Sequence, residues 1–189
     1  MTLRDWLEGS NVAQELAQIN RQSLHRSEAL GFTTRTQVID TLKRLRSLIL
    51  PGIFEREPIG HKQLDAMLSA ELDATAKELC GLVRRVLTHA CAGISDAECD
   101  ERAEQTTVRI LEGLPTIRRL LETDIKAAYE GDPAATSLEE IVLSYPSLEA
   151  ISIYRIAHLV LECGVPIIPR IMTEYAHRTT GIDIHPGAT

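Results

Sequence analysis

The sequence predicts a mainly α protein of about eight helices, and three observations support this fold class. Hydrophobic residues make up 44% of the chain but aromatic residues only 4%, so the apolar positions are mostly Leu, Ile, Ala and Val, which suit packing between helices. These residues recur every three to four positions over long stretches, which is the helical period. With 189 residues, the chain is long enough to bury a sizeable core.

The N-terminal part is expected to form two helices. Residues 11–30 predict a polar, weakly amphipathic helix that ends at Gly31, and residues 1–33 together form a helical N-terminal arm. Residues 34–50 predict the second helix, because their apolar side chains fall on one face while Arg and Lys lie on the other. Pro51-Gly52 ends this helix. Its apolar face consists of Val38, Leu42, Leu45 and Ile49.

Two long helices are predicted next. The first runs from about His61 to Ala90 and carries a stripe of apolar side chains on its buried face. Ser95 or Asp96 caps the helix that follows the intervening turn. Pro115 interrupts this following helix and either kinks it or begins a new one. The stripe of the first long helix comprises Leu64, Leu68, Leu72, Leu79, Val83, Val86 and Ala90.

The last third of the chain predicts three more helices. The turn at 131–133, Gly-Asp-Pro, stops the preceding helix, and a short helix follows around SLEEIVLSY. Two apolar helices come next, over 146–164 and 166–180, and Gly181 ends the second. Residues 34–180 are therefore expected to form one helical domain. The closing stretch TGIDIHPGAT alternates apolar with polar residues and predicts the start of a β-structure.

Charge and hydropathy exclude several classes of function. A net charge of -7 argues against broad binding to nucleic acids or anionic membranes, since both need a basic protein surface. No run approaches the roughly 18 apolar residues that a transmembrane helix needs. The first ten residues, MTLRDWLEGS, place acidic side chains where a signal peptide needs an apolar region. A cytoplasmic protein is therefore expected.

The cysteines have a structural and a chemical interpretation. Cys80, Cys91, Cys99 and Cys163 are widely spaced within helical patterns, so free thiols are favoured over a disulfide framework. His89, Cys91 and Cys99 are close enough in sequence to be candidate metal ligands, but no CxxC pair accompanies them. Buried or half-buried thiols are the favoured interpretation. A helical metal-binding or ligand-binding protein that uses these three residues is the less favoured one.

Several polar side chains are candidates for function, and each has a structural alternative. Asp132 precedes a proline and fits an ordinary turn, in which Asp caps its own backbone. Tyr154 and His158 lie four residues apart on one helical face, which favours a hydrogen-bonded pair in the core. His177 and His185 flank a turn and either face solvent or bond backbone carbonyls. Taken singly, each of these side chains favours the structural role.

The order of the motifs is more specific than any one of them. In chain order they are DIKAAYEGDPAA at 124–135, YRIAH at 154–158, IPRIMTEYAH at 168–177 and TGIDIHPGA at 180–188. In this order and spacing they closely resemble serine acetyltransferase, the enzyme that acetylates the hydroxyl of L-serine from acetyl-CoA at the first step of cysteine synthesis. The resemblance is strong over 124–189 and looser over 34–121.

The resemblance implies a fold for the C-terminal end and a homo-oligomer. In the family, a helical domain leads into a left-handed parallel β-helix of hexapeptide repeats, and residues 181–189 resemble its first strand. Small apolar residues recur every six positions in such repeats, because each coil has flat faces and tight corners. The repeats are not in the sequence, so a fragment with a truncated β-helix is expected. Family β-helices form trimers, and the helical domains join two trimers into a hexamer.

The resemblance also assigns two site residues. Acetyl transfer needs a base for the serine hydroxyl, donors for the oxyanion and a site for the serine zwitterion. The family uses a His base oriented by an Asp, and Asp183 matches that catalytic carboxylate. Asp132 matches a carboxylate that binds the substrate serine, where it can pair with the ammonium group. The residues that match His177 and His185 are not the base, which belongs to a further motif, Asp-His-Ala-Thr-Gly, expected beyond Thr189.

Two functions follow from these assignments. The first is serine O-acetyltransferase, an acyltransferase with acetyl-CoA as co-substrate and neither a bound cofactor nor a metal. The 189-residue chain alone is expected to be inactive, because it lacks the base, the acetyl-CoA site and the C-terminal tail that docks on cysteine synthase. The second is a non-catalytic helical module for oligomerisation or regulation, which buries apolar helix faces against other copies.

Overall fold

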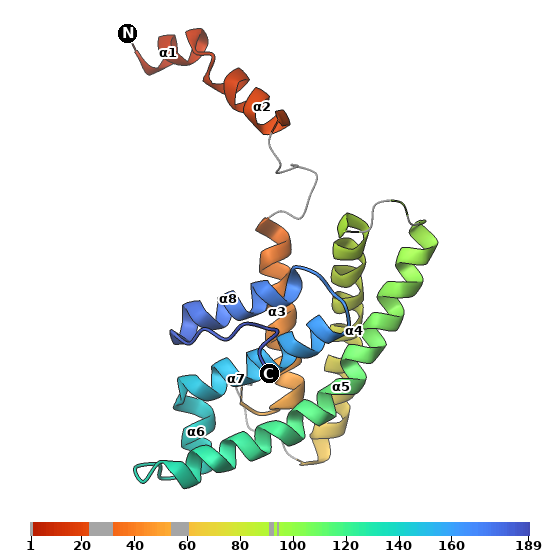
Figure 1. Cartoon of the computed structure of the whole chain (residues 1–189), viewed down its shortest axis with the longest axis vertical. Coiled ribbons are helices and arrows are strands. Elements are labelled where there is room, and N and C mark those ends of the chain that lie inside the picture. Colours follow the sequence, from red (N-terminus) through yellow and green to blue (C-terminus); the bar gives the residue numbers. More distant parts are fainter. Residues whose placement is uncertain (1, 23–31, 54–60, 91–92, 94) are drawn as a thin grey trace.

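The structure, a computed structural model, describes residues 2–22, 32–53, 61–90, 93 and 95–189, and these form helices without any β-strand. The mainly α fold class is therefore confirmed. Figure 1 shows the first two helices, α1 (Leu3–Gly9) and α2 (Val12–Gln22), away from the others. The sequence pattern does not predict α1, because seven residues are too short to show a helical period. The rest of the helix expected over 11–30 lies outside the described residues.

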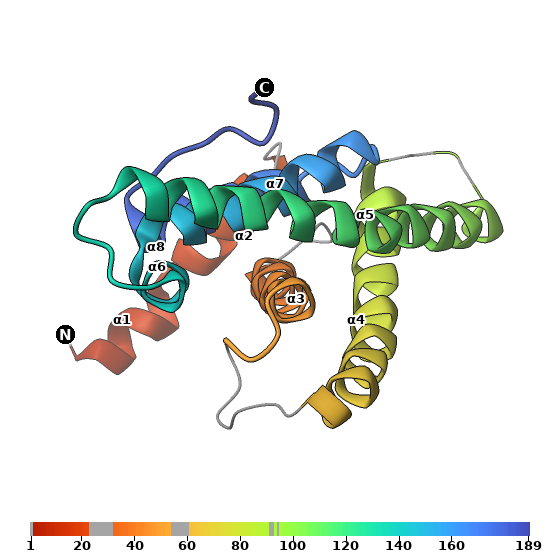
Figure 2. The same cartoon turned by 90° about the horizontal axis from the view of Figure 1, so that it is seen from below.

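As far as the structure describes the chain, α3 (Phe32–Ile49) and the five helices that follow it form the body of the protein. Helix α3 contacts α4 (His61–Ala90), α5 (Asp96–Gly131), α7 (Pro146–Glu162) and α8 (Ile168–Thr180), and Figure 2 shows it end-on among them. The short α6 (Leu138–Ser144) packs against α5 and α7. The apolar face expected on α3 is confirmed, since Val38, Leu42, Leu45 and Ile49 are at most 2% exposed. No helix among these is both long and apolar enough to cross a membrane.

The long helix α4 has the bounds that the sequence predicts, but only its second half buries the expected stripe. Leu79, Val83 and Val86 are fully buried, whereas Leu64 and Leu68 are half-buried. Leu72 is 42% exposed and Ala90 is also exposed. At about 1.5 Å per residue, the 18 residues of α3 cannot reach both ends of the 30-residue α4. Arg44 of α3 binds Glu71 and Glu78, so Leu72 lies within the length that α3 spans but is turned away from the core.

The second long helix, α5, begins as predicted and passes through its proline. Ser95 is the N-cap, because its Oγ accepts the N–H of Glu98 at 3.3 Å while the Glu98 carboxylate accepts the N–H of Ser95 at 3.3 Å. No new helix begins at Pro115, which lies on an exposed side of α5. Buried Leu114 and Ile117 hold the turns on either side of it against the core.

The first β-helix strand expected over 181–189 is not formed. Gly181 ends α8 with a φ of 75°, and the chain then runs extended into a turn in which Ala188 donates its N–H to the carbonyl of His185 at 2.9 Å. A β-helix strand is held by hydrogen bonds to the strand of the next coil, and no described residue provides such a partner. The carbonyls of Pro186 and Ala188 are instead bound by side chains of α7.

Candidate functional site

Asp132 ends α5, and two hydrogen bonds hold its carboxylate. The backbone N–H of Ala134 donates to Oδ1 at 2.9 Å, which is the Asp turn that the sequence predicts. The hydroxyl of Tyr145, which lies between α6 and α7, donates to Oδ2 at 2.5 Å. The second bond joins residues 13 positions apart, so local sequence reasoning could not find it. The carboxylate therefore has a fixed orientation at the corner of α5, α6 and α7.

The same two bonds set the protonation of the pair. The Tyr145 hydroxyl, and after it the Ala134 N–H, lower the pKa of Asp132. The hydrogen bond to Asp132 raises the pKa of Tyr145 to about 12. At neutral pH the carboxylate is consequently ionised while the phenol keeps its proton. An oriented anion that is partly open to solvent suits pairing with an ammonium group.

Titration of Tyr145 is expected to occur near pH 12, later than for an ordinary tyrosine. Because its folded pKa lies above the unfolded value of 10, the bond to Asp132 stabilises the fold fully below pH 10 and is lost as the pH rises to about 12. Phenolate absorbance measured against pH tests this. Tyr145→Phe should remove a step near pH 12, and Asp132→Asn should move that step down toward pH 10. If the step that Tyr145→Phe removes lies near pH 10 in the titration of the wild-type protein, the bond between Tyr145 and Asp132 is contradicted.

Asp183 lies in the extended segment after α8, and 55% of its side chain is exposed. Its Oδ1 is 4.0 Å from Nδ1 of His177, which is too far for a hydrogen bond, so the carboxylate does not orient this imidazole. His185 is exposed, and its Nδ1 accepts the N–H of Gly187 at 3.0 Å. Both histidines thus face solvent, one of the two predicted alternatives. Asp132 is bonded by Ala134 and Tyr145, whereas Asp183 lies near His177, so the structure gives the two carboxylates no shared partner among the described residues.

The expected core pair of Tyr154 and His158 is wrong, because their polar atoms bind the C-terminal segment instead. The two rings touch at a centroid distance of 5.7 Å. The Tyr154 hydroxyl donates to the carbonyl of Ala188 at 2.5 Å, and Nδ1 of His158 lies 2.8 Å from the carbonyl of Pro186. A carbonyl only accepts, so Nδ1 carries the proton. The YRIAH motif therefore fastens the segment that carries Asp183 to α7.

The middle of the same motif ties α7 to α5. Arg155 donates from Nε and Nη2 to the two carboxylate oxygens of Asp124, at 2.7 and 2.8 Å. Both side chains are less than a quarter exposed. This fork geometry is the strongest form of a carboxylate–guanidinium pair, and it raises the pKa of Arg155. Sequence reasoning missed the pair, although Asp124 and Arg155 lie in two of the motifs that carry the resemblance and had no role assigned to them.

The candidate metal ligands do not form a site in the described residues. Cys91 lies outside them, and no group of three or more His, Cys, Asp or Glu side chains within them could hold a metal ion. Cys80, Cys99 and Cys163 are free thiols that are buried or half-buried, as predicted. Burial raises the pKa of Cys163.

Comparisons with known proteins give the class of the chain. A plasmid-encoded serine acetyltransferase of Synechococcus elongatus is 38% identical over 152 residues, which cover 78% of this chain and 48% of that protein. The Bacillus subtilis serine acetyltransferase is 41% identical over 71 residues, 38% of this chain and 33% of that protein. Native serine acetyltransferase 1 from Entamoeba histolytica superposes with a TM-score of 0.62 at 32% identity, over 95% of this chain and 62% of that one. No protein-family model matches the chain.

The helical fold and these similarities show that the chain is related to acyltransferases. More narrowly, the chain is a relative of the serine acetyltransferases, and it aligns with the N-terminal helical part of their structures. It spans about half the length of the S. elongatus relative. The same enzyme from E. histolytica in complex with L-cysteine also superposes with a TM-score of 0.62 at 32% identity, over 83% of this chain and 61% of that one.

Proposed function

We propose that this chain is the serine-binding helical part of a serine O-acetyltransferase, which transfers the acetyl group of acetyl-CoA to the hydroxyl of L-serine and releases CoA. The observation that carries the proposal is the Asp132 carboxylate, which Tyr145 and Ala134 hold ionised and oriented. By resemblance, Asp132 matches the carboxylate with which the family's enzymes bind the substrate serine. A fixed anion there pairs with the serine ammonium and leaves the serine hydroxyl free to react.

In the proposed reaction, a His base takes the proton of the serine hydroxyl as its oxygen attacks the acetyl carbon. The C–S bond then breaks, and the proton passes to the CoA thiolate. Asp183 orients the base, and its exposed carboxylate has no hydrogen-bonded partner among the described residues that would prevent this. Neither His177 nor His185 matches the family's base, whose motif matches no part of the 189 residues.

The domain boundaries belong to the same proposal. Residues 1–33 form the arm, residues 34–180 the helical domain, and residues 181–189 the first strand of a β-helix once a neighbouring coil pairs with it. Tyr154 and His158 support the last assignment, since they bind the carbonyls of Ala188 and Pro186 and so fix the path by which the chain leaves α7 and α8. These two bonds hold the end of the segment 181–189 against α7 even without a neighbouring strand.

The test is L-serine binding by the 189-residue chain, followed by calorimetry or NMR, together with CoA release from acetyl-CoA. Binding without turnover is expected. Asp132→Asn should weaken serine binding at least tenfold, while Asp40→Asn, which removes an exposed carboxylate paired with Lys43, should leave it unchanged. N-acetyl-L-serine, which lacks the ammonium group, should not bind. Serine binding that survives Asp132→Asn would refute the assignment. Turnover abolished by Asp183→Ala would show that a base exists within the chain.

A second candidate, a non-catalytic oligomerisation module, is favoured by the exposed apolar face of α2. Val12, Leu16 and Ile19 follow one face of this helix and are 46 to 61% exposed. Such a face suits contact with another copy, in the dimer of trimers that the resemblance implies or in a smaller assembly. Sedimentation of the wild-type chain and of Leu16→Glu distinguishes this role. Dissociation by the variant with no serine binding in either protein would favour the module over the enzyme.

A further inference from the structure

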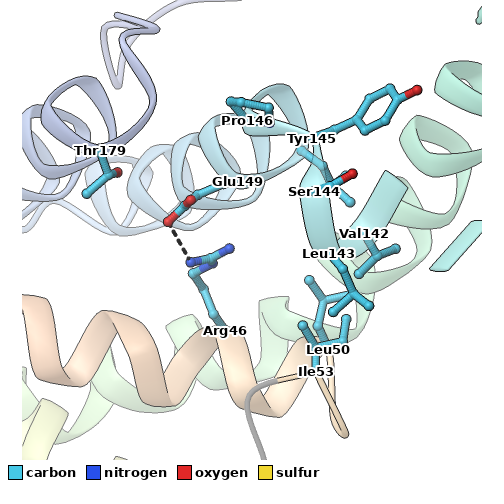
Figure 3. Close-up of a pocket in the computed structure, with 11 residues that line it drawn as sticks. Arg46, Leu50, Ile53, Val142, Leu143, Ser144, Tyr145, Pro146, Glu149 and Thr179 are labelled. Carbon is cyan, nitrogen blue, oxygen red and sulfur yellow. Dashed lines mark hydrogen bonds and ion pairs between the residues drawn. The ribbon is translucent and has the colours of Figure 1, made fainter. Parts of the chain in front are cut away.

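A cavity of about 250 Å³ lies among α3, α6, α7 and α8, and Figure 3 shows the residues that line it. Asp132 is not one of them. Tyr145 lines it, but its hydroxyl bonds Asp132 outside the cavity. One part of the wall is charged, with Arg46 from α3 and Glu149 from α7. Another part is apolar, with Leu50, Ile53, Val142, Leu143 and Leu148. The cavity is smaller than the roughly 300–1,000 Å³ of sites for drug-sized ligands, so only a smaller molecule would fit in it.

Burial and hydrogen bonds hold the charged part of the cavity wall in a fixed arrangement. Arg46 is only 8% exposed, although the sequence places it on the solvent side of α3. Its Nε donates to Oγ of Ser152 at 3.1 Å, and its Nη1 donates to Oε1 of Glu149 at 3.2 Å. Burial lowers the pKa of Arg46, and the charge of Glu149 opposes this. Glu149 keeps 35% of its side chain exposed, and Figure 3 shows its carboxylate bonded to Arg46 between α7 and α3.

We propose that this cavity binds a free α-amino acid with an apolar side chain. An α-amino acid carries its carboxylate and ammonium on neighbouring atoms, which matches a guanidinium and a carboxylate 3.2 Å apart. A ligand with one charge alone would meet repulsion from one of the two side chains. The apolar side chain of the ligand packs against Leu50, Val142 and Leu143, which gives selectivity against polar amino acids such as L-serine.

The ligand test uses L-leucine as the probe and the whole 189-residue chain. Calorimetry or NMR titration should show L-leucine binding, with leucinamide, which lacks the carboxylate, at least tenfold weaker. The 4-methylpentanoate anion, which lacks the ammonium group, should also be at least tenfold weaker. Equal binding of either analogue would overturn the zwitterion assignment. Absence of L-leucine binding at tens of millimolar would overturn the site.

Two substitutions on α6 test whether the ligand binds in the cavity, and both leave the buried Arg46 in place. Leu143→Asp puts a charge on the apolar wall at a side chain that is 68% exposed, so the fold should survive. It should weaken L-leucine binding at least tenfold at an unchanged melting temperature. Leu138→Asp is the matched control, because Leu138 is also on α6 and 47% exposed but does not line the cavity. Equal binding by both variants would refute the location.

Asp132→Asn separates this proposal from the proposed serine site. L-leucine binding should be unchanged in Asp132→Asn, because this carboxylate is not part of the cavity wall. If the variant loses L-leucine and L-serine binding together, both amino acids bind at Asp132 and the cavity proposal fails while the serine site stands. If it loses only L-serine binding, both proposals are supported.

Discussion

Arg155→Ala is expected to lower the free energy of unfolding by about 2–3 kcal/mol, because it leaves the carboxylate of Asp124 without its partner. Removing one partner of a fully buried pair costs about 3–5 kcal/mol, and the partial exposure of these two side chains, 23% and 22%, reduces that cost. Urea unfolding measures the difference. The loss should be accompanied by faster amide exchange where α5 and α7 meet, since the pair joins these helices.

A double-mutant cycle separates the pair from other contacts of Arg155. Asp124→Ala combined with Arg155→Ala should cost clearly less than the sum of the two single variants. Arg170→Ala serves as the control, because its pair with Glu174 is exposed and lies within a single helix, α8, so it should contribute only about 0.3–0.5 kcal/mol. If Arg155→Ala costs no more than Arg170→Ala, the interhelical pair does not hold α5 and α7 together.

The parts of this fold that the sequence predicts are the ones set by local signals. The ends of α4 and the Ser95 cap depend on residues within a few positions, and the apolar face of α3 follows from its own period. Side chains that change role through tertiary contact were not predictable in this way. Arg46 was expected with the other basic side chains on the face of α3 opposite the apolar one, but it borders the apolar face, three and four residues from Ile49 and Leu42. Ser152 and Glu149 of α7 make its burial possible. The apolar stripe predicted on α4 is buried only in the second half of that helix, which its own period does not reveal.

The candidate site shows the same division. Asp132 and Asp183 came from a resemblance between motifs, and only the turn at Ala134 was readable from the residues themselves. Only the structure reveals the bond from Tyr145 to Asp132, because Tyr145 follows α6 and is distant from Asp132 in the sequence. The backbone also holds a conformation that no local pattern predicts: Ile167 has a φ of 68° although its β-branched side chain disfavours it. The Ile168 N–H donates to the carbonyl of Pro166 at 2.7 Å across this residue, which starts α8 in a fixed direction.

Ile156→Ala is expected to have the largest effect on stability, about 2–5 kcal/mol, because Ile156 is fully buried on α7 and its truncation leaves a cavity. This helix packs against α3, α5, α6 and α8 and also carries Arg155, Tyr154 and His158. A large part of the roughly 5–15 kcal/mol that stabilises a typical domain would thus be lost at one position. Urea unfolding monitored by circular dichroism should show the midpoint falling.

A conservative substitution and a substitution at an exposed side chain serve as controls for the unfolding measurement on Ile156→Ala. Ile156→Val should cost about 0.5–1.5 kcal/mol, and Leu143→Ala, at a side chain that is 68% exposed, much less than Ile156→Ala. A graded loss in this order would show that α7 is held by close packing in the core. Its motif side chains then act from a rigid support, with Arg155 reaching α5 while Tyr154 and His158 hold the segment of Asp183. An Ile156→Ala cost as small as that of Leu143→Ala would mean that α7 is not that support, and the positions of Asp132 and Asp183 would need another explanation.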